Sequence, residues 1–218
     1  MKRVLTLDCT LRDGGYCNNW KFGHQNIVKV INGLVESGVD YIECGYVSSF
    51  AKADNDSTKY SDFRQLNNII STIRTSTKYL VMINYGEISI EQIPKKNETV
   101  VDGIRVAFHK KDLDKAIEFC EEIKNKGYEV FVQPMVTMCY SDVEFNRLIE
   151  GVNGFNPTAL YIVDSFGMMK QMDILHYARL SKEMNPGIML GLHAHNNMQL
   201  AFANSQCFSE LELARCIV

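Results

Sequence analysis

Three side chains in two widely separated stretches of the sequence have the chemistry of a metal site. Asp13 lies in the segment DCTLRDGGY near the amino terminus, and His193 and His195 lie in the segment HAHNN near the other end. Residues i and i+2 of a strand project to the same side, so the two imidazoles would lie roughly 7 Å apart at their α-carbons. One carboxylate and two imidazoles leave coordination positions open, which predicts a catalytic divalent ion bound by these three residues.

Each group of candidate ligands follows a short apolar run that predicts a β-strand. Residues 4–7, VLTL, precede the first motif, and the pair Gly14–Gly15 would end that strand by supplying backbone freedom that other residues lack. Residues 188–192, IMLGL, lead directly into the first histidine. We therefore expect Arg12 and Asp13 at the carboxyl end of one strand and the two histidines at the carboxyl end of another.

Between the two motifs, short apolar runs alternate with stretches of helical periodicity. After the first strand, the predicted strands are residues 41–46, 79–84, 103–108, 129–134, 160–163 and 188–192, and the predicted helices are residues 26–37, 63–72, 110–126, 141–151, 173–184 and 200–213. This alternation is typical of a parallel sheet built from βα units. The polar span 48–61 has no apolar period and indicates a long loop, of the kind that often closes an active site.

Composition excludes several classes of function. A chain of 218 residues with 46% hydrophobic and 22% charged residues predicts one ordinary domain over residues 1–218. The formal net charge of −3 gives no basic footprint for nucleic acid, and neither a signal peptide nor a membrane span is recognisable. The seven cysteines include no CxxC pair, which favours reduced thiols. We expect a cytoplasmic protein that acts on a small molecule.

The two motifs together resemble the signatures of the DRE-TIM metallolyase superfamily, the HMGL-like barrels. DCTLRDG matches its opening signature and HAHNN its metal-binding signature, in the expected order and about 180 residues apart. The superfamily includes hydroxymethylglutaryl-CoA lyase, isopropylmalate and homocitrate synthases and 4-hydroxy-2-oxovalerate aldolase. The resemblance implies a TIM (β/α)8-type barrel, a 2-oxo acid substrate such as pyruvate, and Mg²⁺ or Mn²⁺ as the cofactor, with Zn²⁺ as the alternative.

The same resemblance implies an eighth strand, for which little sequence remains. Only residues 214–218 follow the last predicted helix, so we expect a barrel truncated at the start of strand eight. Strands one and seven would then keep unpaired backbone groups, unless a partner segment or a second copy of the chain fills the gap. Relatives also carry an Asn in this region that joins the metal shell, and this chain has no counterpart.

Arg12, Glu43 and Tyr16 are the predicted catalytic residues. Arg12 presents a fixed fork of donors that can hold the oxygen that becomes negative when an enolate forms, or the substrate carboxylate. It can also be only the structural ion-pair partner of Glu43, which matches the Glu of the family signature and could instead relay a proton. Tyr16 stands where aldolases of 4-hydroxy-2-oxo acids have a catalytic His. A phenol ionises near pH ~10 and is a poor base at neutral pH, so Tyr16 is either an acid/base group or an aromatic that packs on the substrate.

Four further residues at predicted strand ends are candidates for substrate binding. Arg105 and His109 lie in IRVAFH, and Asp164 and Ser165 lie in VDSFG. Both segments resemble family positions that face the catalytic rim, and His109 is a further candidate to accept the proton of a 4-hydroxyl group. An Asp at a strand end is also often only a cap for the helix that follows.

Three functions fit these residues. The first is a divalent-metal-dependent aldolase or lyase that breaks or forms a carbon–carbon bond beside a 2-oxo acid through a metal-stabilised enolate. The second is a Claisen-type acyl-CoA condensing synthase of the isopropylmalate synthase kind, and the third is a catalytically idle, truncated barrel. Gly15–Tyr16 stands where most synthases and coenzyme A lyases have Glu-Gln, which favours the first.

Overall fold

The computed structural model of the chain describes residues 3–70, 76–211 and 214–217. Its strands are β1 (Leu5–Asp8), β2 (Tyr41–Val47), β3 (Lys59–Tyr60), β4 (Lys78–Asn84), β5 (Gly103–Phe108), β6 (Glu129–Pro134), β7 (Ala159–Asp164), β8 (Leu190–Ala194) and β9 (Ala214–Ile217). Its helices are α1 (Thr10–Asp13), α2 (Gly15–Asn18), α3 (His24–Ser37), α4 (Arg64–Asn67), α5 (Leu113–Asn125), α6 (Asp142–Phe155), α7 (Gln171–Met184) and α8 (Ala201–Ser209). Single 3₁₀ turns are η1 (Ile90–Gln92), η2 (Lys96–Glu98), η3 (Lys110–Asp112) and η4 (Thr137–Cys139).

The strand-helix alternation and the parallel pairings are those of a (β/α) barrel, which confirms the predicted fold class. The predicted strands are all present, with ends that differ by a few residues. The predicted loop 48–61 contains β3, and the predicted helix 63–72 is only α4, with residues 71–72 lying outside the described part. Within the described residues, no helix is long and apolar enough to cross a membrane.

Contacts along the chain divide it into two compact units. The amino-terminal unit comprises residues 6–106 and 122–130, and the carboxyl-terminal unit comprises residues 1–5, 107–121 and 131–218. The division passes through β1, β5, α5 and β6, which contribute residues to both units. The single domain predicted for residues 1–218 therefore stays a prediction.

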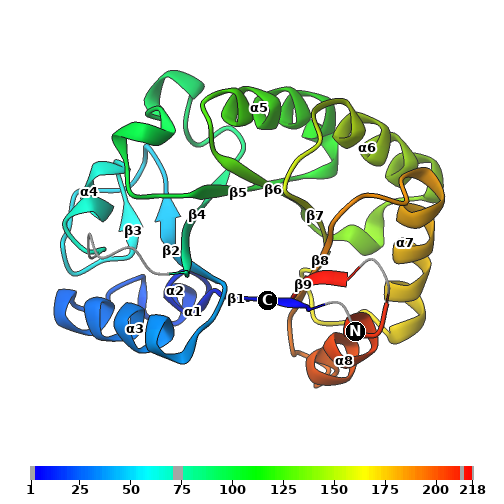
Figure 1. Cartoon of the computed structure of the whole chain (residues 1–218), viewed down its shortest axis with the longest axis horizontal. Helices are drawn as coiled ribbons and strands as arrows, with labels where there is room; N and C mark the ends of the chain where they lie inside the picture. Colours follow the sequence, from blue (N-terminus) through cyan, green and yellow to red (C-terminus); the bar gives the residue numbers. More distant parts are fainter. Residues whose placement is uncertain (1–2, 71–75, 212–213, 218) are drawn as a thin grey trace. The chain divides into compact units, whose positions relative to one another are not determined.

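The amino-terminal unit is built on β2, which is buried at all seven of its residues. Its strands follow the order β5-β4-β2-β3, and β1 also pairs with β2 in parallel. The register places Leu7 opposite Tyr41 and Asp8 opposite Ile42. Helix α3 packs against β2 (Figure 1), and its buried residues include Ile27. β2 is thus covered by neighbours and can hold polar side chains away from water.

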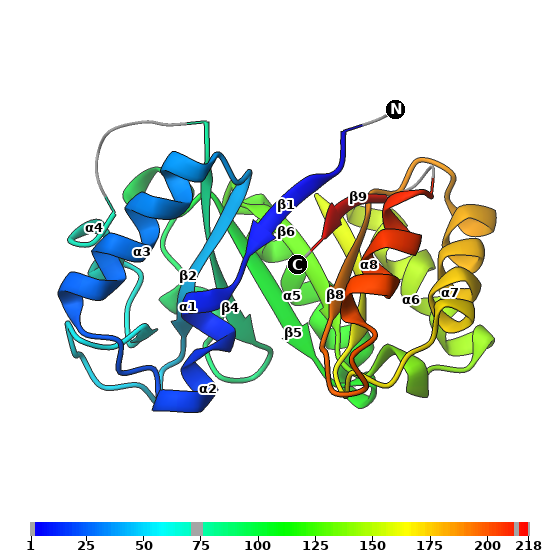
Figure 2. The same ribbon diagram turned by 90° about the horizontal axis from the view of Figure 1, so that it is seen from below.

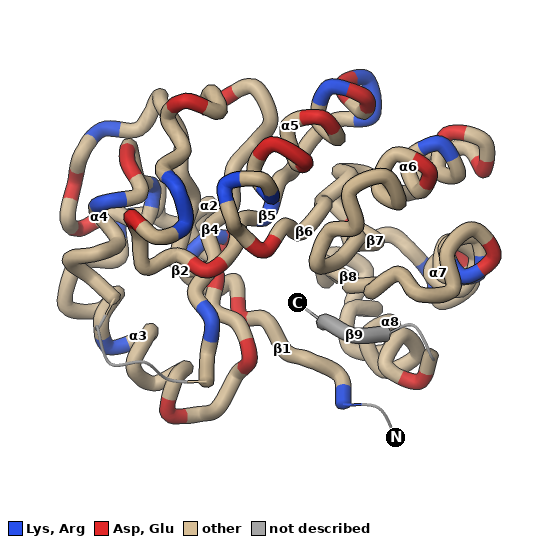
Figure 3. Tube along the Cα trace, turned by 45° about the horizontal axis from the view of Figure 1, so that its top comes forward, with Lys and Arg blue, Asp and Glu red and all other residues tan. Residues whose placement is uncertain are grey.

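The carboxyl-terminal unit orders its strands β6-β7-β8-β9, all parallel. Figure 2 shows α6 and α7 side by side, and the Phe145 and Tyr177 rings meet between them with centroids 4.7 Å apart. Figure 3 shows Asp, Glu, Lys and Arg residues along α6 and α7, whereas β8 contains none of these four types. β8 is therefore a core strand whose only titratable side chain is a histidine.

β9 lies where the sequence predicted the start of strand eight. It pairs in parallel with β8, with Leu190 opposite Ala214, Gly191 opposite Cys216 and Leu192 opposite Ile217. The expectation that the seventh barrel strand would keep unpaired groups is therefore wrong for residues 190–192. The four residues of β9 are enough to pair with the three residues 190–192 of β8.

The segment after β1 also differs from the prediction, because Arg12 and Asp13 lie in α1 rather than at the end of a strand. The side chain of Asp8 starts this turn. Its carboxylate accepts hydrogen bonds from the Thr10 backbone N–H and the Thr10 hydroxyl, both at 3.0 Å. A short polar side chain that bonds two residues ahead favours a turn over a continued strand.

Gly14 and Gly15 do not supply the unusual backbone that was expected. Gly14 has φ −61° and ψ −18°, an ordinary helical conformation, and Gly15 begins α2. A Cβ on Gly15 would lie 2.0 Å from Cδ1 of Trp20, whose indole ring occupies that space. Gly15 is therefore required for close packing, and its conformational freedom is not used.

Replacing Gly15 with Ala is expected to lower the free energy of unfolding by about 1–3 kcal/mol, as overpacking of a filled site does. Denaturant titration followed by circular dichroism measures this change. Gly33→Ala is the matched control, because Gly33 lies inside α3 with nothing within 4 Å of an added Cβ. It should be neutral or stabilise the protein by about 0.5–1 kcal/mol. Equal effects at the two positions would contradict the packing role of Gly15.

Candidate active site

Arg12 is held in the amino-terminal unit by contacts on several sides. Its side chain is 6% exposed, Nε donates to Glu43 Oε2 at 2.7 Å, and Nη1 donates to Asp13 Oδ1 at 2.6 Å. The Trp20 indole N–H donates to the Arg12 carbonyl at 2.9 Å. These bonds fix both the backbone and the plane of the guanidinium.

Glu43 receives a second guanidinium from a neighbouring part of the same unit. Arg105, on β5, is fully buried, and its Nη1 lies 2.9 Å from the same Oε2 that accepts from Arg12. Two arginines and two carboxylates, Glu43 and Asp13, therefore balance in charge. The structure brings these four predicted residues together, and it places Arg105 against Glu43 without exposure to solvent. Contact of Arg105 with a substrate stays a prediction.

The surroundings of Arg12 keep it charged. Burial alone would lower its pKa, but the carboxylates of Glu43 and Asp13 raise the pKa of Arg12 above its ordinary value. Burial also raises the pKa of the neighbouring Cys9 thiol to about 12, so Cys9 is neutral at physiological pH. Arg12 is therefore a fixed cation that can stabilise negative charge.

In the carboxyl-terminal unit, His193 lies in β8 and His195 follows directly after the last residue of that strand. His193 is buried, His195 is half-buried, and their ring centroids are 4.6 Å apart at an interplanar angle of 82°. His195 Nδ1 lies 2.8 Å from the carbonyl oxygen of Asp164. A carbonyl can only accept, so this contact assigns the proton to Nδ1 and makes Nε2 the ring nitrogen that carries the lone pair a metal would need.

The loop after β7 fixes the position of that carbonyl. The Asp164 carboxylate accepts the backbone N–H groups of Met168 and Met169, at 2.9 and 3.2 Å. Gly167 has φ +61°, and a Cβ there would lie 2.5 Å from the backbone N of Asn197. The loops after β7 and β8 thus pack backbone to backbone. Asp164, predicted to bind substrate, is buried and bonded within its own loop.

The remaining predicted residues make other contacts or are exposed. Tyr16 is 64% exposed, and its ring packs edge-on against Trp20 with centroids 4.8 Å apart. His109 is exposed just beyond β5. Ser165 accepts the backbone N–H of Val136 at 2.8 Å through its hydroxyl. The catalytic role of Tyr16 and the substrate roles of His109 and Ser165 stay predictions.

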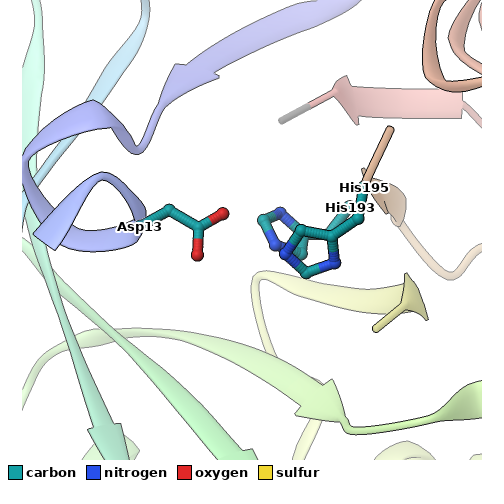
Figure 4. A group of neighbouring side chains, drawn as sticks. All are labelled: Asp13, His193 and His195. Carbon is teal, nitrogen blue, oxygen red and sulfur yellow. The ribbon is translucent and has the colours of Figure 1, made fainter. Parts of the chain in front are cut away.

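Asp13, His193 and His195 form a candidate group of metal ligands within the described part of the chain (Figure 4). The set of donors fits a divalent ion, because carboxylate and neutral imidazole are ordinary ligands of Mn²⁺ and Zn²⁺, and three protein ligands leave positions for water or substrate. The bond from His195 Nδ1 to a carbonyl is the second-shell contact that metal-ligating histidines commonly make.

Sequence reasoning missed two residues that shape the site. Trp20 supports the Arg12 carbonyl and fills the space beside Gly15, and Gly167 permits the contact between the loops after β7 and β8. The Gly of VDSFG was a usable signal, since a glycine after a strand end often marks a close backbone approach. Nothing in the sequence around Trp20 indicates that its indole bonds a carbonyl eight residues earlier.

Comparisons with known proteins agree with the family that the motifs suggest. The HMGL-like family model matches residues 3–209. A 4-hydroxy-2-oxovalerate aldolase from Geobacillus thermodenitrificans is 25% identical over 202 residues, covering 91% of this chain and 58% of that protein. An oxaloacetate decarboxylase from Mycobacterium tuberculosis is 23% identical over 205 residues, covering 94% of this chain and 60% of that protein.

A solved structure matches the fold over almost the whole chain. The N-terminal domain of a provisionally named aldolase from Bacteroides vulgatus superposes with a TM-score of 0.77 and 25% sequence identity, covering 99% of this chain and 72% of that chain. The chain spans about three fifths of the length of the two curated relatives. The match therefore supports the barrel fold, while the activity of the relatives' full-length chains does not transfer directly.

Replacing Glu43 with Gln is expected to lower the free energy of unfolding by about 3–5 kcal/mol, because it leaves two buried guanidinium groups without their shared carboxylate. Denaturant titration at neutral pH measures the loss. Asp114→Asn is the matched control, since Asp114 pairs with Arg147 at 2.7 Å but both side chains are more than 60% exposed. That exposed pair should contribute less than about 1 kcal/mol. If the two variants lose the same stability, Glu43 does not hold the cluster together.

Proposed function

This chain belongs to the HMGL-like family, and we propose that it is a divalent-metal-dependent aldolase that breaks or forms a carbon–carbon bond beside a 2-oxo acid. The observation that carries the proposal is the buried Arg12, fixed by Glu43 and Asp13 next to the family's metal-ligand position. A fixed cation at the end of the first βα unit suits a reaction in which an oxygen of the substrate becomes negative. The name of the aldolase relative from Geobacillus thermodenitrificans supports the same class of reaction.

Asp13, His193 and His195 would hold the metal ion. When bound, a divalent ion supplies Lewis-acid stabilisation of the negative charge that develops on a 2-oxo acid, an effect of several kcal/mol. His195 offers Nε2 because its Nδ1 is bonded to the Asp164 carbonyl. The Asp13 carboxylate is oriented by Arg12 Nη1. Mg²⁺ and Mn²⁺ suit the carboxylate and added water, and Zn²⁺ is the alternative because imidazole suits it.

Arg12 would act on the enolate oxygen or on the substrate carboxylate. Its orientation is set before substrate arrives, because Glu43 accepts from Nε and Asp13 accepts from Nη1. A donor that needs no reorganisation stabilises the transition state more than the ground state, and so it raises kcat rather than only lowering KM. Glu43 would then be a positioning residue that acts through Arg12.

The proton of the 4-hydroxyl group must leave during cleavage, and two side chains are candidates to accept it. Tyr16 stands at the position of the catalytic His in the resembling aldolases, and its ring is largely exposed to solvent. His109 is exposed beyond β5 and carries an imidazole suited to proton transfer near neutral pH. Tyr16→Phe and His109→Gln, compared by their pH–rate profiles, would identify the base.

Metal binding is expected to depend on both histidines. Titration calorimetry with MnCl₂ should give a binding isotherm for the parent chain and none for His193→Ala or His195→Ala, because each substitution removes one of three protein ligands. His176→Ala is the control, since His176 pairs with Asp142 at 2.7 Å on the surface of α7. An affinity in the His193 and His195 variants equal to that of the parent would place the metal site elsewhere.

Catalysis is tested by exchange of the methyl hydrogens of pyruvate. The parent with Mn²⁺ should exchange them with solvent deuterium, observed by proton NMR, because enolate formation is the step common to cleavage and condensation. Arg12→Lys keeps the charge but loses the fork, and we expect the rate to fall by roughly 10²-fold. Arg179→Lys, at an exposed position on α7, is the control and should match the parent.

The outcome also separates the alternatives. If the metal-loaded chain exchanges no deuterium, the idle barrel is favoured. Release of free thiol from acetyl-CoA in the presence of a 2-oxo acid would identify a Claisen-type synthase. An unchanged exchange rate in Arg12→Lys would mean that Arg12 is only the structural partner of Glu43.

A further inference from the structure

A hollow of about 460 Å³ opens in the carboxyl-terminal unit, beside the ends of β5, β6 and β7. We call it the β5–β7 hollow, and its main lining residues are His109, Lys110, Lys111, Met135, Val136 and Phe166. Its volume lies in the range of small-molecule sites. The carboxyl ends of the strands are also where enzymes of this fold class bind their substrates. A lining that combines basic and apolar side chains suits a ligand with both characters.

Lys110 is a fixed part of the wall and has its charge compensated. Its Nζ lies 2.9 Å from Glu144 Oε1 and donates to the Cys139 carbonyl at 2.9 Å. Glu144 is bonded in turn to the backbone N–H and the hydroxyl of Ser141. These bonds, above all those with Ser141 and Lys110, lower the pKa of the Glu144 carboxyl to about 2, so it stays ionised opposite Lys110.

Lys111 is left with an uncompensated charge. The nearby Asp114 is paired with Arg147 at 2.7 Å, and Asp112 does not line the hollow. Within the described residues, Lys111 makes no ion pair with a carboxylate. The β5–β7 hollow therefore carries about one net positive charge at its basic wall, which one monovalent anion would neutralise.

The apolar part of the lining includes a residue with a strained backbone that neighbouring elements hold in place. Val136 has φ 54° and ψ 52°, a left-handed conformation that is a genuine outlier for a β-branched side chain. Its N–H is bonded to the Ser165 hydroxyl at 2.8 Å. The next residue, Thr137, donates to the Pro134 carbonyl and accepts from the Val163 N–H. Strain that neighbouring elements maintain in this way is concentrated at ligand sites.

We propose that the β5–β7 hollow binds the far end of the substrate's aldehyde half, and that this end is a short aliphatic chain closed by a carboxylate that pairs with Lys111. The apolar side chains of Met135, Val136 and Phe166 receive the aliphatic part. A carboxylate matches the single uncompensated charge, whereas a phosphate dianion would exceed it. This inference rests on the proposed aldolase function and names the class of its second substrate as an aliphatic semialdehyde acid.

Binding is tested without catalysis, using pentanoate as the probe and pentanamide as its neutral counterpart. Both are titrated into the chain labelled with ¹³C at its methionine methyl groups, and the Met135 signal, assigned with Met135→Leu, is followed by NMR. Pentanoate is expected to shift this signal and to bind at least 10-fold more tightly than pentanamide. In Lys111→Met this preference should disappear.

Lys115→Met is the matched control, because Lys115 is an exposed lysine in α5 that does not line the hollow. It should bind pentanoate as the parent does. Lys111 is itself exposed, so its replacement does not threaten folding. Equal affinity for the two probes, or unchanged pentanoate binding in Lys111→Met, would overturn the proposal.

Acceptor preference separates failure of the inference from failure of the proposed function. With pyruvate and Mn²⁺, the parent should use 5-oxopentanoate with a kcat/KM at least 10-fold above that for pentanal, and Lys111→Met should lose this difference. Deuterium exchange into pyruvate with no preference between the two acceptors would leave the aldolase standing and refute the role of the hollow. Pentanoate binding that depends on Lys111, in a chain that exchanges no deuterium, would refute the aldolase and keep the hollow as a carboxylate site.

Discussion

One carboxylate oxygen, Glu43 Oε2, accepts from Arg12 and lies against Arg105 where solvent has no access. Charges buried in this way cost several kcal/mol each unless they are paired, so the folded chain must bring all three side chains to one point. They come from α1, β2 and β5, and the parallel pairing of β1 with β2 is what lets α1 reach Glu43. The packing of the amino-terminal unit is thus tied to the geometry of its candidate catalytic arginine.

This constraint makes Arg12 a different chemical group from a surface arginine. Its charge is permanent because the neighbouring carboxylates raise its pKa, and its plane is set by acceptors on Nε and Nη1. A rigid, desolvated cation stabilises a developing negative charge without reorganising, which is the electrostatic requirement of enolate chemistry. The same geometry predicts that lysine would be a poor replacement, since an ammonium group has no planar fork to place against two carboxylates.

Strands and helices with a periodic pattern of apolar residues were predictable from the sequence. Short elements that depend on a single side-chain contact were not. Alternating apolar runs identified β5 and β6 with the ends that the structure has, because a strand or helix of ordinary length leaves a periodic pattern. The four-residue helices α1 and α2 leave no such pattern. They exist because Asp8 bonds Thr10 and because the Trp20 ring fits over Gly15. The charge types at the site were predictable, but the burial of Arg105 against Glu43 depends on packing between elements far apart in sequence.

Hydrogen bonds to backbone carbonyl groups orient several side chains of the candidate site. The types of residue in the sequence do not reveal such bonds. The Trp20 indole bonds the Arg12 carbonyl, and His195 bonds the Asp164 carbonyl. The Asp164 carbonyl can only accept a hydrogen bond, so it selects the His195 tautomer that carries its proton on Nδ1. The path of β7 therefore determines which ring nitrogen of His195 can face a metal, and no neighbouring charge is needed. A change that moves this carbonyl, such as crowding at Gly167, would therefore act on metal affinity through geometry, with no change in the charge or identity of a ligand. The loop after β7 is in this sense part of the candidate metal site, because its backbone positions one of the candidate ligands.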